Sequence, residues 1–318
     1  MKLASKNIQI FPLKILLSIL YGIFVYVNVS SWSFDYEAIV KTIEYFQRQN
    51  LSFIAILGFN SFSTYGLTKA LVGYPAEFIA SLFYGLCACI RFLVYSLLLP
   101  AVWFIPIFLS MAVMLDFNMS RYSLATTLFI FLFGVLKRNN LHNMGIWKTG
   151  LTISLFFLLH HFSAAFIALF SRTNILFRLT IISLIPIFVF FLSSIFSRFL
   201  SETDGDFPRI TYVYFALTLI SIIGFKINKN DLKPFISIIA LLLSFQLSGI
   251  QFNSAYYTRF AFLVFEVTLI TIALNTTAFS FRGHRTDFNI KYIRLLIVCF
   301  ISTLYQVILI NGNIWRFF

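Results

Sequence analysis

The chain has 318 residues, of which 60% are hydrophobic and only 11% are charged, and its formal net charge is +13. Soluble globular domains carry about 25% charged and about 45–50% apolar residues, so the composition excludes a soluble enzyme and predicts an all-α, polytopic transmembrane helical bundle. The lysines and arginines are scattered over loops and segment ends, where they contact lipid headgroups, so the positive charge does not indicate nucleic-acid binding.

The first apolar segment, residues 10–29, has three lysines before or near its start, Lys2, Lys6 and Lys14, and lacks a small-residue cleavage site. We therefore expect a retained signal-anchor helix with a cytoplasmic N-terminus. Residues 30–74 form the longest interruption, and their mixed charge predicts a long outer loop between the first two spans. The half-apolar middle of this loop, residues 51–72, predicts interfacial or re-entrant helices, with a polar span as the alternative.

The next apolar region, residues 75–115, is long enough for two helices with almost no loop. We expect Arg91 to mark the turn between them, because a lone cation is expensive inside a span. Residues 116–121 are then predicted to face outward. They lead to a span over residues 122–136 and to a basic cytoplasmic loop over residues 137–148.

The rest of the chain adds apolar segments that are separated by polar loops. Basic loops are expected on the inner side of the membrane. When spans are counted from the two ends of the chain, the number of spans between the basic loops in the middle does not bring both loops to the inner side. This conflict predicts a broken segment within residues 149–200 or a misassigned loop. We count ten spans, with eleven as the alternative, in a single integral membrane domain. The further apolar segments cover residues 149–170, 175–196, 212–225, 235–250, 260–279 and 295–310.

Three ionisable side chains near the middle of the chain are candidates for chemistry. Arg121 opens a span, where its planar donors suit a diphosphate or carboxylate, and a snorkelling Arg at the lipid boundary is the alternative. His160 and His161 are adjacent, so they point about 100° apart and only one can face a cavity. One of them could act as acid or base, or could simply contact a neighbouring helix. Adjacent histidines are a poor metal site, and we expect no metal.

Arg259 and Glu266 lie seven residues apart, on one face of a late apolar segment. An acid at membrane depth is either paired or functional, so Glu266 is expected to pair with Arg91 or Arg178, or to be protonated. The chain has no Walker loop, dinucleotide turn, zinc signature or nucleophile elbow. We therefore expect no cofactor and no soluble catalytic domain.

Four short motifs resemble those of the integral-membrane polysaccharide polymerases of the Wzy/EpsG type. RYSLA at Arg121–Ala125 is followed, after a basic loop, by HFSA at His161–Ala164, as in that family. Asp35-Tyr36 is similar to its early outer Asp-Tyr motif. The stretch Tyr256–Arg259 is similar to its late Arg that enters a helix after a Tyr-containing loop.

This chain departs from the family pattern at two places. Tyr122 stands where the family has Gln, and Phe62–Leu67 replaces its Glu-Pro motif. The resemblance implies a membrane glycosyltransferase that polymerises undecaprenyl-diphosphate-linked oligosaccharide repeat units for O-antigen, capsule or exopolysaccharide. It would act at the outer face of the bacterial inner membrane and would need no nucleotide sugar.

The resemblance also implies roles for particular residues. Arg121 and Arg259 would bind the substrate diphosphate, and His161 or Asp35 would act as the catalytic base. The implied partners are lipid-linked glycans, the lipid bilayer, a chain-length regulator and a flippase. The further candidates, all ionisable residues within apolar segments, are His160, Glu266 and Arg91.

Two other classes of protein fit the composition. A lipid-linked oligosaccharide flippase predicts internal repeats and polar residues through the depth of the bundle, whereas few polar residues interrupt the apolar segments here. A membrane acyltransferase that modifies surface glycans is expected to carry its His and Arg at an early, cytoplasmic helix start, whereas the His pair of this chain lies near its middle.

Overall fold

The computed structural model describes residues 2–33, 35–51, 62–119, 122–128, 130–131, 209–223, 254–276 and 285–311. Within these ranges the chain is almost entirely helical and contains no strand, which confirms the all-α prediction. The chain packs into two compact units. The predicted spans and loops between residues 132 and 208, and the span over residues 235–250, lie outside the described residues.

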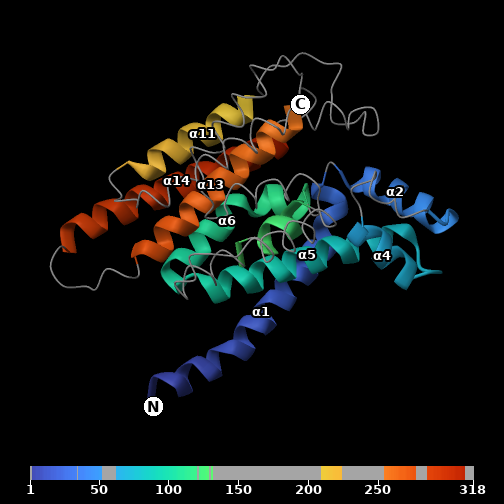
Figure 1. Cartoon of the computed structure of the whole chain (residues 1–318), viewed down its shortest axis with the longest axis horizontal. Helices are drawn as coiled ribbons and strands as arrows, with labels where there is room; N and C mark the ends of the chain where they lie inside the picture. Colours follow the sequence, from blue (N-terminus) through green and yellow to red (C-terminus); the bar gives the residue numbers. More distant parts are fainter. Residues whose placement is uncertain are drawn as a thin grey trace, which may run out of the picture. The chain divides into compact units, whose positions relative to one another are not determined.

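Among the described residues of the first unit, two helices are long and apolar enough to cross a membrane (Figure 1). These are α1, whose apolar part is Phe11–Trp32, and α5. A helix of about 20 apolar residues spans a bilayer core of about 30 Å, so both fit the predicted membrane location. The described helices of this unit are α1 (Lys2–Trp32), α2 (Tyr36–Arg48), α4 (Phe62–Ala70), α5 (Ala76–Leu98) and α6 (Ala101–Phe117).

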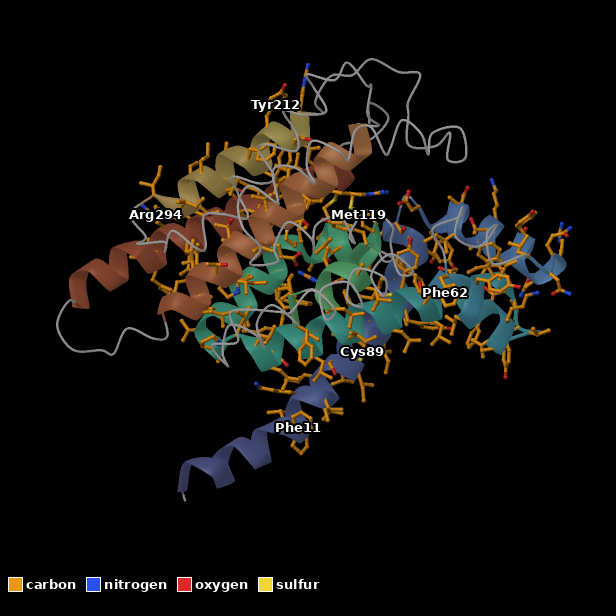
Figure 2. The ribbon with its side chains drawn as sticks, viewed as in Figure 1. Phe11, Phe62, Cys89, Met119, Tyr212 and Arg294 are labelled. Carbon is orange, nitrogen blue, oxygen red and sulfur yellow. The ribbon has the colours of Figure 1, made fainter. Side chains whose placement is uncertain are left out.

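Helices α1 and α5 are antiparallel and cross with their backbones in contact. A Cβ atom built on Gly22 would lie 2.8 Å from the carbonyl oxygen of Gly85, and one on Gly85 would lie 2.8 Å from that of Gly22. Beside the crossing, the Cys89 thiol donates to the Ser18 hydroxyl over 3.7 Å (Figure 2). Small residues allow this close approach, which is how apolar helices associate in a membrane.

The turn between α5 and α6 lies at Leu99 and Pro100, so the prediction of two helices with almost no loop is confirmed. Arg91, however, is not at this turn. It lies inside α5 and is completely buried, so its assignment as the turn marker was wrong. Proline has no N–H and forces an extended residue before it, so Pro100 and not the charge sets this helix boundary.

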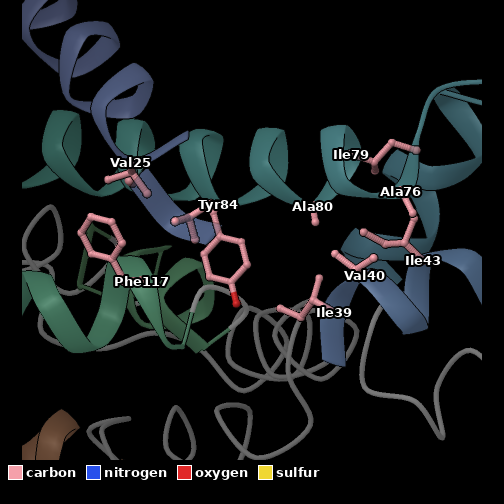
Figure 3. Close-up of a cluster of buried hydrophobic side chains, with 11 residues drawn as sticks. Val25, Ile39, Val40, Ile43, Ala76, Ile79, Ala80, Tyr84 and Phe117 are labelled. Atoms are coloured by element: carbon pink, nitrogen blue, oxygen red, sulfur yellow. The ribbon is translucent and has the colours of Figure 1, made fainter. Parts of the chain in front are cut away.

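One apolar cluster in the first unit joins four helices (Figure 3). Val25 and Val29 from the end of α1 meet Tyr84 of α5, Phe117 from the end of α6 and Ile39 near the start of α2. Three helix ends therefore gather at one end of the unit. The remaining members of the cluster are Val40, Ile43, Ala76, Ile79, Ala80 and Ala88.

Helix α2 lies inside the predicted outer loop. Its apolar stripe, formed by Ile39, Val40, Ile43 and Phe46, is buried in the first unit. The Tyr36 hydroxyl fixes the start of the helix, because it lies within hydrogen-bonding distance of the Ser81 hydroxyl (2.9 Å) and the Glu77 carbonyl (3.0 Å) on α5. The apolar face of α2 is thus used for packing on the protein, and its exposed face is polar.

The second unit is built on α11 (Arg209–Ile222), α13 (Ser254–Thr276) and α14 (Arg285–Asn311). Residues 261–273 of α13 are all buried, and α11 packs against both α13 and α14. Helices α13 and α14 begin earlier than predicted. Residues assigned to the polar loops before them are helical, because a helix continues beyond the stretch that hydropathy detects.

Candidate functional site

The sequence-predicted site residues fall into three groups in the structure. Asp35 is exposed, directly before α2, and its backbone carbonyl accepts a hydrogen bond from the Ile39 amide over 3.0 Å. Arg91, Arg259 and Glu266 lie within helices. The other three candidates, which are Arg121, His160 and His161, lie outside the described residues.

The first unit contains a buried ion pair between α5 and α6. Nη1 of Arg91 donates to Oδ2 of Asp116 over 2.8 Å, and both side chains are 0% exposed. Nη2 of Arg91 donates to the Phe108 carbonyl over 3.0 Å. Asp116 was predicted in an outward-facing polar turn. The structure places it in the last turn of α6 instead, where the charge of Arg91 compensates its own.

Tyr21 of α1 joins this pair. Its hydroxyl donates to the same carboxylate oxygen of Asp116 over 2.8 Å, so one oxygen accepts from two helices. Aromatic rings enclose the cation. The Arg91 guanidinium lies 4.4 Å from the centre of the Phe108 ring and 4.8 Å from that of Tyr95. Arg91, Asp116 and Tyr21, which we call the buried charge cluster, tie α1, α5 and α6 together.

The chain after α6 returns to the buried charge cluster. Asn118 ends α6, and its side-chain amide donates to the Val113 carbonyl over 3.2 Å. Residues 122–128 are again helical, and the Ser123 amide donates to the Met119 carbonyl over 2.7 Å. The Ser123 hydroxyl lies beside the Asp116 carboxylate. The described residues on both sides of Arg121 in the sequence therefore make buried polar contacts.

The second unit holds Arg259 and Glu266 on α13. Arg259 is half-buried, and Glu266 is 1% exposed. Arg259 was predicted to begin its helix, but α13 begins five residues earlier at Ser254, so Arg259 lies in its second turn. Arg91 pairs with Asp116 within the first unit, and the expected pairing of Glu266 with Arg91 or Arg178 stays a prediction.

A second polar network lies between α11 and α14. Nε2 of Gln306 donates to the Tyr214 hydroxyl over 2.9 Å and to the Ser302 hydroxyl over 3.3 Å, and these two hydroxyls lie 3.0 Å apart. All three side chains are buried. Such interhelical hydrogen bonds satisfy polar groups that the bilayer cannot. Among the described residues, no three His, Cys, Asp or Glu side chains gather closely enough to hold a metal ion.

Sequence reasoning missed Asp116 and Tyr21 as parts of a site. One signal was available, because Arg91 and Asp116 are opposite charges in consecutive apolar helices joined by a tight turn. Two such charges can neutralise each other at membrane depth. Tyr21 gave no signal, since a Tyr in a first apolar segment is equally suited to the membrane interface.

A scan against protein-family models found no match, and searches of the curated proteins and of the solved structures also found none.

Proposed function

We propose that this chain polymerises lipid-linked oligosaccharide repeat units at the outer face of a bacterial inner membrane. The donor is a growing glycan on undecaprenyl diphosphate, and the acceptor is another lipid-linked unit. The four motifs described above support this function, as do the two helices that can cross a membrane.

The observation that carries the proposal is the gathering of helix ends in the first unit. Ile39 and Phe117 belong to one apolar cluster. Asp35 lies four residues before Ile39 in the chain, and Arg121 lies four residues after Phe117. Asp35 directly precedes α2, about 6 Å along the helix from Ile39, and four residues of chain beyond Phe117 reach at most about 14 Å. Chain connectivity therefore favours one location for the Asp-Tyr motif and the Arg motif, although they are far apart in sequence.

This location fits the membrane orientation that we propose. With a cytoplasmic N-terminus, α1 enters from the inner side and its Trp32 end emerges on the outer side. The ring centres of Trp32 and Phe117 lie 5.0 Å apart, so the end of α6 is on that same side. A site at this end would open to the outer headgroup layer, where the diphosphates of both substrates lie. The multi-pass arrangement of the remaining apolar segments belongs to the same proposal.

The chemistry needs a cation and a base. The acceptor sugar hydroxyl attacks the anomeric carbon of the donor glycan, and the bond from that carbon to the diphosphate oxygen breaks. Arg121, with Arg259 as a second candidate, stabilises the negative charge that develops on the leaving undecaprenyl diphosphate. His161 or Asp35 takes the proton from the attacking hydroxyl. The donor diphosphate supplies the driving force, so no nucleotide is consumed.

The test is a glycan gel of a strain that lacks the gene, complemented with wild type, Arg121→Ala, Asp35→Asn or Arg48→Ala. Arg48 is the matched control, because it is an exposed cation in the last turn of α2. We expect single repeat units with the empty strain and Arg121→Ala, fewer long chains with Asp35→Asn, and a full ladder with Arg48→Ala. A full ladder from Arg121→Ala that inserts normally would contradict the proposal.

A lipid-linked oligosaccharide flippase is a second candidate, because the second unit buries a polar network and an acid within apolar helices. Tyr214, Ser302 and Gln306 form the network, and Glu266 is the acid. Transporters place such groups along a substrate path. Loss of a flippase leaves lipid-linked units on the cytoplasmic face, whereas loss of a polymerase leaves them on the outer face. Labelling of the units in intact cells with a membrane-impermeant reagent distinguishes the two.

A further inference from the structure

Helix α4 exposes an uncharged stripe on the side that faces away from the protein. The exposed positions recur every four residues, at Phe62, Gly66 and Ala70, and residues at this spacing share one face of a helix. Thr64 and Thr68, on the opposite face, are buried, and α4 packs against α2 and α5. A surface helix in water normally buries its apolar side and exposes its polar side. Helix α4 does the reverse.

The turn after α4 continues this surface to the two helices that can cross a membrane. Val72 is 70% exposed, and Tyr74, just before α5, is 53% exposed. The Tyr74 ring stacks on the Phe78 ring of α5 with 5.2 Å between their centres, and the Phe78 ring meets the Tyr26 ring of α1 edge-on at 6.2 Å. A row of aromatic rings thus leads from α1 and α5 to the turn. Tyr side chains are enriched where spanning helices reach the lipid headgroups.

Charge distinguishes α4 from α2. Within residues 62–76, all of them described, Lys69 is the only charged residue. Its ammonium is bound at the end of α2, where it donates to the Gln49 carbonyl over 3.2 Å and to the side-chain oxygen of Asn50 over 3.1 Å. The exposed residues of α2 include three charged ones, Glu37, Lys41 and Arg48. The exposed side of α2 is therefore suited to water, and the exposed side of α4 is suited to the boundary between headgroups and acyl chains.

We propose that the exposed stripe of α4 and the turn after it lie against the lipid bilayer, in the leaflet where α1 ends and α5 begins. These two helix ends lie on one side, because Tyr26 contacts Phe78. Lipid is favoured over a protein partner, since the surface is continuous with two helices that are themselves suited to a bilayer. Its lack of exposed charge over residues 62–76 fits the headgroup–acyl boundary and no particular headgroup charge. The proposal holds with or without the proposed polymerase activity.

The test measures whether lipid or water reaches each side of the α2–α4 pair. A nitroxide spin label is attached to Gly66→Cys, Val72→Cys or Lys41→Cys in the full-length protein, in nanodiscs that hold a single copy. Both stripe positions accept a label, because a Cβ atom on Gly66 meets nothing within 4 Å and Val72 is exposed. Lys41→Cys is the matched control on the charged side of α2. Labelled wild type corrects for Cys89, a half-buried native thiol.

The readout is the rate of collision of each label with two relaxing agents. Oxygen concentrates in lipid, whereas a charge-neutral nickel chelate stays in water. We expect oxygen collisions to exceed nickel collisions at the Gly66→Cys and Val72→Cys labels, and the reverse at the Lys41→Cys label. If the nickel chelate reaches all three labels equally, the stripe faces water and the proposal is overturned. If neither agent reaches the two stripe labels, protein covers them, and the proposal is overturned as well. No step requires glycan polymerisation, so this proposal and the proposed function fail separately.

Discussion

Replacing one partner of the Arg91–Asp116 pair should be far more costly than replacing both. Arg91→Met leaves the Asp116 carboxylate buried with no cation, and Asp116→Leu leaves a buried guanidinium with no anion. Breaking a buried pair in this way costs about 3–5 kcal/mol. The double variant removes both charges together. It loses the hydrogen bond from Tyr21, worth about 1 kcal/mol, and should otherwise stay close to wild type in stability.

A double-mutant cycle measures the difference. The purified protein is unfolded by SDS titration in mixed micelles, and the transition is followed by tryptophan fluorescence. We expect a coupling energy of about 3 kcal/mol or more between Arg91 and Asp116. The control is Arg48→Met, an exposed cation on α2, which should change stability by about 0.5 kcal/mol or less. If the double variant loses the sum of the two single losses, the two charges do not stabilise each other.

Three further changes test the packing of each unit. Gly22→Ala places a Cβ atom 2.8 Å from a backbone carbonyl of α5 and should cost about 1–3 kcal/mol in the same unfolding assay, whereas Gly66→Ala meets open space and should be neutral or stabilising. Tyr214→Phe removes the central hydroxyl of the α11–α14 network and should cost about 0.6–1.7 kcal/mol, with Tyr212→Phe as the exposed control on the same helix. Tyr36→Phe loses the contacts to α5 and should speed amide exchange in α2 while leaving α1 unchanged, and equal exchange in α2 would contradict the anchoring role.

Hydropathy alone was enough to predict the helical class, the long first apolar helix and the tight pair α5 and α6. These features depend on apolar runs of sufficient length and on one proline, both of which are local properties. The boundaries near charges were predicted less well. Arg285 and Arg294 were assigned to a loop, yet both lie in α14, because helix formation does not stop where a segment becomes polar.

The placement of Arg91 and Asp116 could not be derived from their local sequence. Each is a lone charge in an apolar stretch of sequence. Because burying a single charge is costly, sequence reasoning places each of these two residues at a turn or boundary instead of inside a helix. The cost disappears only when the two helices are stacked, and the stacking is a tertiary property. Arg91 and Phe108 are about equally far from the turn at Leu99, and they are in contact. Asp116 lies two helical turns beyond Phe108, so the long Arg side chain must extend toward the end of α6 to reach it.

Because the Arg91 side chain extends toward the end of α6, the buried charge cluster lies close in sequence to the proposed site. Arg91 and Tyr21 hold Asp116 in the last turn of α6, immediately before the segment that leads to Arg121 in the sequence. A side chain that must bind a diphosphate needs its backbone fixed by a supporting layer of interactions. A buried ion pair between rigid helices provides this support better than a surface contact, because water and salt do not screen it. Under the proposed function, the pair that sequence reasoning treated as two separate boundary charges therefore supports the chain segment that leads to Arg121.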